Sequence, residues 1–155
     1  MKFGTSQPVL RKEDSRFLTG AGRYVDDIAP EGAGVAAFLR SPLAHAEILS
    51  IDAEAARGAP GVLTVITGAE LSGEIKNFLD NSTVMSRDGK PGAAPVRHAL
   101  AVDRVRFVGE AVALVVAETA AQARDAVEMI EIDYKELPAA NSTAEAESQP
   151  EVHPE

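Results

Sequence analysis

The 155-residue sequence contains no cysteine. That absence excludes disulfides, thiolate zinc sites, iron–sulfur ligation and a cysteine nucleophile. It is compatible with a cytoplasmic location, which we expect, because the fold needs no oxidising compartment. Tryptophan is also absent and aromatic residues make up only 5% of the chain. So few aromatic rings argue against a stacking platform for single-stranded nucleic acid.

Long apolar runs are missing as well. No segment approaches the length of a transmembrane helix, and the opening MKFGTSQPVL lacks the apolar stretch of a secretory signal. The formal net charge of −9 repels nucleic acid and anionic lipid. We therefore expect neither nucleic acid nor a membrane among the partners.

The residues that are present suit one globular domain, since 45% of the chain is hydrophobic. Residues 1–30 differ from the rest because they combine many charges with several glycines, and they predict an extended arm with turns. The positively charged side chains of this arm could bind an acidic surface of a partner. The alternative is that the arm is simply solvated. The candidate interface residues of this arm are Arg11, Arg16, Arg23 and Tyr24.

Three short segments predict strands in the first half of the chain. Residues 35–40 (VAAFLR) suit a buried strand, and residues 47–53 (EILSIDA) alternate apolar with polar side chains. Residues 62–67 (VLTVIT) are rich in β-branched side chains. One helical turn is expected between the last two, and residues 68–97 predict a short helix followed by a loop.

Residues 106–134 predict a strand, a helix and a second strand. The first strand is expected over residues 106–118, with a bulge or close backbone approach at Gly109. Thr119 and Gln122 have the spacing of a capping box. The helical spacing of four apolar residues predicts packing on the sheet, and the strands would form a right-handed crossover if they are parallel. Those four residues are Ala120, Ala123, Val127 and Ile130.

No residue pattern in the chain predicts catalysis. His45, His98 and His153 are far apart and suit surface or turn positions better than a metal site. Asp26 and Asp27 are adjacent, so in an extended segment they would point to opposite sides. We therefore expect no catalytic, cofactor-binding or metal-binding residue. The residues alone predict a soluble α+β domain, followed at 140–155 by a small, polar and acidic linker.

Three blocks of the sequence resemble a known family in the same order and at compatible spacing. They are RKEDSRFLTGAGRYVDDI (11–28), AAFLRSPLAHAEILSIDAEAARGAPGVLTVITGAEL (36–71) and ALAVDRVRFVGEAVALVVAETAAQARDAVEMIEIDYKELPA (99–139). The chain resembles the N-terminal α/β hammerhead domain of the molybdenum hydroxylase large subunits. This family comprises the xanthine dehydrogenases, aldehyde oxidases and carbon monoxide dehydrogenases.

The resemblance implies an α/β hammerhead at residues 31–139, a mixed β-sheet with a few short helices packed on one face. It implies that residues 140–155 lead toward a molybdopterin-binding domain outside this sequence. In the parent enzyme, molybdopterin would lie in those downstream domains, with iron–sulfur and FAD groups on partner subunits or domains. This chain alone would bind no cofactor and be inactive.

The parent reaction implied by the resemblance is hydroxylation of an aldehyde, a purine or a related carbon centre with oxygen from water, or oxidation of CO. Assembly into a homo-oligomer stays open. Two other hypotheses remain. One is a free-standing hammerhead module that binds or assembles without catalysis, and the other is an unrelated α+β domain that binds a small molecule.

Overall fold

The computed structural model describes residues 11–75, 85, 87–92 and 95–153. The chain divides into two compact units, Met1–Ala33 and Gly34–Glu155. In the first unit, the described residues form the short helix α1 (Asp14–Leu18) and the 3-10 helix η1 (Val25–Asp27), and neither helix contains a buried residue. The expected extended arm is therefore partly helical, because local hydrogen bonds stabilise these turns.

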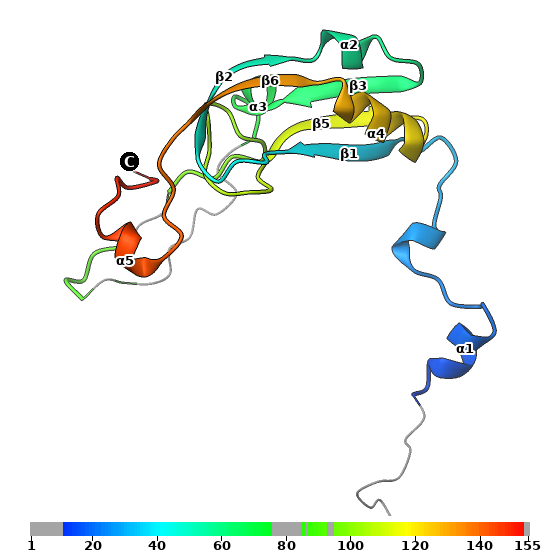
Figure 1. Ribbon diagram of the computed structural model, residues 1–155. Coiled ribbons are helices and arrows are strands. Elements are labelled where there is room, and N and C mark those ends of the chain that lie inside the picture. Colours follow the sequence, from blue (N-terminus) through cyan, green and yellow to red (C-terminus); the bar gives the residue numbers. More distant parts are fainter. Residues whose placement is uncertain (1–10, 76–84, 86, 93–94, 154–155) are drawn as a thin grey trace, which may run out of the picture. The chain divides into compact units, whose positions relative to one another are not determined.

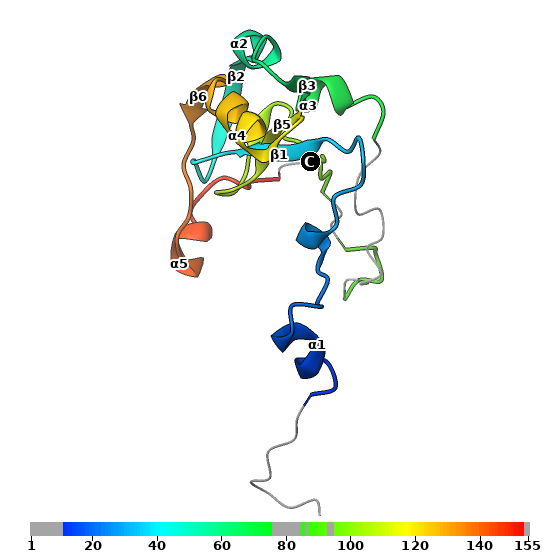
Figure 2. The same ribbon diagram turned by 90° about the vertical axis from the view of Figure 1, so that its right-hand side faces the viewer.

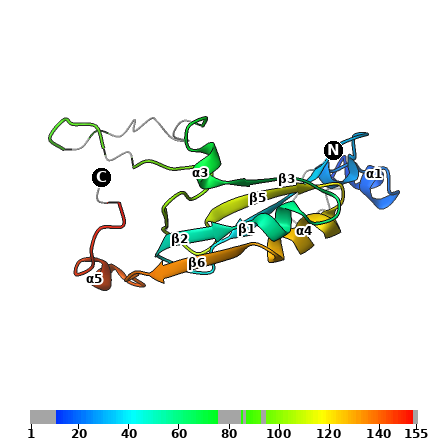
Figure 3. The same ribbon diagram turned by 90° about the horizontal axis from the view of Figure 1, so that it is seen from above.

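The second unit contains two three-stranded antiparallel sheets (Figure 1). Sheet A has the strand order β1–β5–β3 and sheet B the order β4–β2–β6. Figure 3 shows β5 beside β3 and β2 beside β6. The strands span β1 Val35–Arg40, β2 Ala46–Asp52, β3 Val62–Thr67, β4 Arg104–Val105, β5 Ala111–Ala117 and β6 Glu131–Glu136.

The described residues of the second unit also form four short helices: α2 Glu54–Arg57, α3 Gly68–Leu71, α4 Ala120–Glu128 and α5 Thr143–Ala146. The helices α2 and α4 lie side by side against one face of sheet A (Figures 1 and 2). None of the helices in the described part of the chain combines the length and apolar content that crossing a bilayer requires.

The main core lies between sheet A and these two helices. Val65 and Val115 lie directly opposite each other on β3 and β5, and both are buried. Alanines on the helices allow close approach to the sheet. The cluster consists of Ala53, Ala56, Val65, Ala113, Val115, Ala126 and Ile130. A second cluster, which contains Val105 and Val112, joins sheet B to the end of β5.

The N-terminus of α4 has the Thr119 cap, but the Gln122 side chain accepts from the Thr119 hydroxyl and not from its backbone N–H, so the predicted capping box is only half formed. The backbone N–H of Gln122 donates to Thr119 Oγ1 at 3.3 Å, and the Thr119 hydroxyl donates to Gln122 Oε1 at 2.8 Å. Of the four residues expected on the packed face, Ala120 is exposed. Ala123 and Ile130 are buried and Val127 is half-buried, as expected, and Ala126 is fully buried as well because it lies three residues after Ala123 on the same face of the helix.

Two predictions about strands were wrong. β1 is an edge strand with mostly exposed side chains, so it is not buried as its apolar sequence suggested. Residues 106–110 form a turn, and β5 begins only at Ala111. Gly109 has a φ of 89°, the left-handed conformation that glycine adopts without strain, so it belongs to this turn and makes no bulge.

The segment from β5 through α4 to β6 also differs from the expected crossover. β5 and β6 belong to different sheets, and the described pairings are antiparallel. β5 and β6 therefore do not form the parallel pair that a right-handed crossover requires. The α+β class with a few short helices is confirmed, in the form of two small antiparallel sheets.

Candidate functional site

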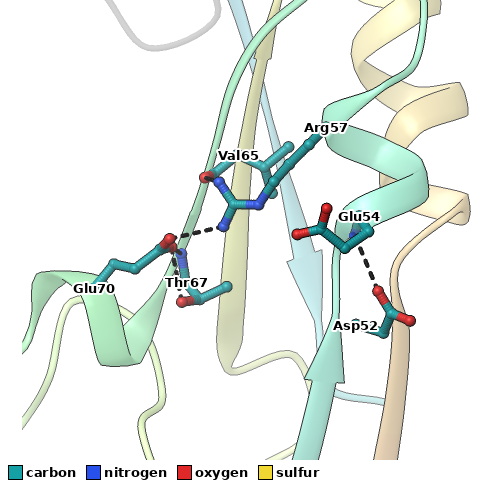
Figure 4. A network of polar contacts seen from close by, with 6 residues as sticks. All are labelled: Asp52, Glu54, Arg57, Val65, Thr67 and Glu70. Atoms are coloured by element: carbon teal, nitrogen blue, oxygen red, sulfur yellow. Dashed lines mark hydrogen bonds and ion pairs between the residues drawn. The ribbon is translucent and has the colours of Figure 1, made fainter.

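The most connected group of polar side chains lies around Arg57 (Figure 4). Arg57 Nη1 donates to the carbonyl oxygen of Val65 at 2.8 Å, and Nη2 donates to Glu70 Oε1 at 2.7 Å. Glu70 Oε2 accepts from the Thr67 backbone N–H at 2.7 Å and from the Thr67 hydroxyl at 2.9 Å. This network ties α2 to β3 and to the start of α3.

The electrostatics of this network suit a structural role. The Thr67 backbone hydrogen bond, helped by the Thr67 hydroxyl and the Arg57 guanidinium, lowers the pKa of Glu70 against an opposing effect of burial. Glu70 is therefore held as a carboxylate with both oxygens engaged. A general acid or base instead needs a pKa near the working pH and a free lone pair or proton.

The histidines do not form a site together. His45 lies in a bend before β2, as the turn alternative predicted, but it is only 7% exposed, and its Nδ1 lies 2.8 Å from the carbonyl oxygen of Pro138. His98 is exposed and His153 is half-buried. Within the described residues, no three His, Asp or Glu side chains are grouped as metal ligands. His45 fastens the segment after β6 to the start of β2, where Leu137 N also donates to the His45 carbonyl oxygen.

The adjacent acids of the arm have a local function. Asp27 Oδ2 accepts from the Tyr24 backbone N–H at 2.8 Å, which caps η1. The expectation that this segment is extended was wrong, because Val25–Asp27 forms a 3-10 helix. Asp26 and Asp27 both lie in the first turn of η1. Their negative charges interact favourably with the partial positive charge of the helix N-terminus.

The candidate interface residues of the arm are grouped around an aromatic stack. The rings of Phe17 and Tyr24 lie 5.3 Å apart with an interplanar angle of 18°. The Arg16 guanidinium lies 5.2 Å from the centre of the Phe17 ring. Arg16 and Tyr24 therefore both contact Phe17, whereas Arg11 and Arg23 are exposed residues outside the stack. The sequence reading missed Phe17, although its position between Arg16 and the glycine turn was a usable signal.

Neither of two hollows in the described residues suits a pterin cofactor. One, of about 260 Å³, is an open depression lined by Phe17, Gly20, Gly22, Tyr24 and Asp27. Its charged lining group is a carboxylate, which would repel a phosphate. The other, of about 10 Å³ beside α3, has room for little more than a water molecule. Neither of these two hollows therefore fits molybdopterin.

One buried hydroxyl has no hydrogen-bond partner. Tyr134 on β6 packs against the second core cluster, and its hydroxyl oxygen makes no hydrogen bond within the described residues. The Ser41 hydroxyl donates to the Leu43 carbonyl oxygen and accepts from the Leu43 N–H. Burial raises the pKa of Tyr134, and the Ser41 hydroxyl opposes part of that rise. Tyr134 therefore stays neutral and contributes mainly its ring.

Sequence comparison relates the chain to large subunits of hydroxylases and dehydrogenases. It is 41% identical over 129 residues to the nicotine 6-hydroxylase large subunit of Paenarthrobacter nicotinovorans, covering 83% of this chain and 15% of that protein. It is 39% identical over 128 residues to the carbon monoxide dehydrogenase large chain of Afipia carboxidovorans, with the same two coverages. It is 34% identical to the xanthine dehydrogenase molybdenum-binding subunit of Escherichia coli O157:H7, covering 83% of this chain and 17% of that one.

Solved structures agree with this assignment. Quinoline 2-oxidoreductase from Pseudomonas putida 86 superposes with a TM-score of 0.69 at 42% identity, covering 84% of this chain and 16% of that one. Aldehyde oxidoreductase from Desulfovibrio gigas gives a TM-score of 0.73 at 31% identity, covering 93% and 16%. The chain thus spans only about a sixth of the proteins that it matches. Residues 19–138 match the aldehyde oxidase and xanthine dehydrogenase a/b hammerhead domain, and the chain belongs to this family.

Proposed function

We propose that these residues serve as the N-terminal structural and assembly domain of a molybdenum-dependent oxidoreductase large subunit. The observation that carries this proposal is the hammerhead match over residues 19–138, in relatives of which it makes up only 15% to 17%. One of these relatives is named as a molybdenum-binding subunit. The domain gives its large subunit a folded frame, and other polypeptide carries the chemistry.

The division of labour in this proposal follows from the chemistry of the chain. Its described residues contain no group of three metal-ligating side chains, and the two hollows described above do not fit a pterin. Molybdopterin is then held by the downstream domains, and iron–sulfur and FAD groups by partner subunits or domains. When bound there, the molybdenum centre would supply hydroxylation of a carbon centre with oxygen from water, or oxidation of CO. The residues described above contribute packing and contacts.

The proposal retains the three regions that the sequence predicts: arm 1–30, hammerhead 31–139 and linker 140–155. It also retains the cytoplasmic location, since a chain without cysteine needs no oxidising compartment. Within the linker, Thr143–Ala146 forms the short helix α5, which has no buried residue. A segment with so little to bury suits a connection between domains.

Metal and pterin analysis tests the assignment. The 155-residue chain is purified alone and together with the remaining subunits or domains of its enzyme. We expect no molybdenum and no pterin in the isolated chain, and both in the assembly that retains it. Turnover or a tightly held pterin in the isolated chain would refute the division of labour. A chain that never associates with molybdenum-containing protein would favour the free-standing module.

We also infer that the arm contacts a partner through Arg11, Arg16, Arg23 and Tyr24. Tyr24 is 64% exposed, and Leu18 and Val25 of the same arm are 86% and 84% exposed. Aromatic and arginine side chains next to exposed apolar groups are typical of interface centres.

Charge reversal in the arm tests this contact. In the full assembly, the double substitution Arg16→Glu and Arg23→Glu should reduce co-purification of the partner. The matched control is Arg87→Glu with Arg124→Glu, two exposed positions of the second unit that change the net charge by the same amount. Unchanged co-purification of the arm variant would leave a simply solvated arm as the explanation.

A further inference from the structure

The outer face of sheet A, opposite α2 and α4, is apolar across all three strands. Phe38 on β1 and Ile66 on β3 are both directly opposite Leu114 on β5, so the three side chains form one cross-strand row. In the next row, Val116 lies between Ala36 and Thr64. Phe38 is 46% exposed. We define this surface by its apolar residues Ala36, Phe38, Leu63, Ile66, Leu114 and Val116.

Leu63 extends the same surface at its far end. It lies at the irregularity between Val62 and Thr64 and is 58% exposed. A Cβ atom added to Gly34 would lie 2.8 Å from Val116 Cγ1 and 3.1 Å from Leu63 Cδ1, so both side chains converge on this glycine. The surface is therefore continuous across the strands, and its residues are not apolar positions scattered singly.

The outer face of sheet B provides an internal comparison. Glu47 on β2 lies opposite Arg104 on β4 and Lys135 on β6. Its carboxylate is 3.7 Å from Arg104 Nη2 and 3.0 Å from Lys135 Nζ. Here the corresponding cross-strand row is charged and self-paired. A solvated sheet face normally has this polar character, so the apolar row of sheet A calls for a covering surface.

The core formed by the described residues does not explain why the outer face of sheet A is apolar. The inner face of sheet A, with Ala113 and Val115, is already covered by α2 and α4. The outer row contributes little to that core, because alternate residues of a strand point to opposite faces. Leaving Phe38 and Leu63 in water gains no stability for the isolated domain.

We propose that the outer face of sheet A docks against an apolar surface of the remaining large subunit, the polypeptide beyond the hammerhead in the matched relatives. This inference rests on the proposed function. The relatives supply an occupant of sufficient size, since about five sixths of their length lies outside the matched region. The six apolar residues bear no charge, so the complementary surface is apolar as well.

Phe38 is the anchor of this docking surface. The Arg40 guanidinium lies 5.5 Å from the centre of the Phe38 ring, and Arg40 Nη1 donates to the Gly109 carbonyl oxygen at 2.8 Å. The arginine is thereby held beside the ring. A ring whose neighbours are already ordered loses less conformational entropy when it is buried, which favours binding.

Thiol labelling in the assembled enzyme tests the proposal. Phe38→Cys and, as matched control, Leu49→Cys each place one thiol in these cysteine-free residues. Leu49 is 57% exposed on β2 of sheet B, so both positions are accessible in the domain itself. Maleimide labelling of each peptide is followed by mass spectrometry, in the native enzyme and in urea. We expect Phe38→Cys to react at least about tenfold more slowly in the native enzyme than in urea.

A photo-crosslink identifies what covers the face. Phe38→p-benzoylphenylalanine, a substitution of similar shape, should crosslink to the remainder of the large subunit. Crosslinks to a second copy of this domain, to residues 1–33 or to another subunit would overturn the proposal, as would a Phe38→Cys thiol that reacts as fast in the native enzyme as in urea. If the molybdenum-containing enzyme assembles and the thiol is reactive, only this inference fails. If the chain does not assemble with molybdenum-containing protein, the proposed function fails too.

Discussion

The central strands of the two sheets, β5 and β2, differ in the number of their residues that are buried. β5 (AVALVVA) contains no polar side chain, and four of its seven residues are buried. β2 (AEILSID) includes Glu47, Ser50 and Asp52, and only Ala46 is buried. A continuous apolar strand is typical of a sheet covered on both faces, whereas alternation is typical of a sheet with one solvated face. The contrast indicates that both faces of sheet A are suited to be covered, whereas only one face of sheet B is.

Substitutions on the two faces of β5 should have the largest and most divergent effects. Val115 is fully buried, so Val115→Asp would place an unpaired carboxylate in the core and cost at least about 4 kcal/mol of unfolding free energy. Val116→Asp, on the half-buried outer face, should cost below about 2 kcal/mol. Circular dichroism and urea titration of both variants check this. A folded, soluble Val115→Asp domain would contradict the core assignment.

An intermediate effect is expected at the edge of sheet A, where Glu70 joins α3 to Arg57. Glu70→Gln removes the charge from the Thr67 and Arg57 contacts and should cost about 1 kcal/mol at neutral pH. Because the pKa of Glu70 is lowered in the folded state, the contribution of its charge is fully present above the ordinary value of 4.5. It is lost as the pH falls through the folded-state pKa.

Urea denaturation of the native and Glu70→Gln chains across this pH range measures that contribution. Their difference should be largest at neutral pH and shrink in acid. Glu74→Gln, which removes the same charge from an exposed position one turn later, is the matched control. A difference between the native and Glu70→Gln chains that does not change with pH would show that the carboxylate charge is not what stabilises the contact.

The smallest effect is expected from removing only the hydroxyl of Tyr134 in sheet B. Its buried hydroxyl lacks a hydrogen-bond partner among the described residues, so Tyr134→Phe removes an uncompensated polar group. The unfolding free energy should stay within about 0.5 kcal/mol of the native value or rise slightly. Tyr134→Ala, which also removes the ring from the second cluster, should cost about 3 kcal/mol. Thermal melts of the two variants distinguish the hydroxyl from the ring, and a marked loss in Tyr134→Phe would reveal a hidden partner.

Local sequence signals located most of the regular structure. The β-branched run at Val62–Thr67 is β3, and the alternation after Ala46 is β2. Thr119 caps α4 because its hydroxyl satisfies a free N–H of the first turn, a contact decided within four residues. Such features depend on neighbours in the chain, which is why the pattern alone predicts them.

The candidate sites were harder to predict. His45 gave the signal of a turn histidine, yet it is buried because the chain after β6 returns to it through Pro138, more than ninety residues later. The stack of Phe17 on Tyr24 depends on a glycine turn that brings the two rings together. The sequence carries no signal for the contact of His45, since Pro138 is ordinary by itself, whereas the position of Phe17 beside the glycine turn was a usable signal.

The sequence by itself determined the positions of β1, β2, β3 and α4, the Thr119 cap of α4 and the family, because these depend on periodicity, local hydrogen bonds and ordered blocks of residues. Only the tertiary structure decided that β5 and β6 enter separate sheets and that β1 lies at an edge. It alone aligned Phe38, Leu114 and Ile66 in one cross-strand row on the outer face of sheet A. The physical reason is that pairing and register join residues far apart in the chain, and the apolar character of a strand does not state which neighbour will cover it.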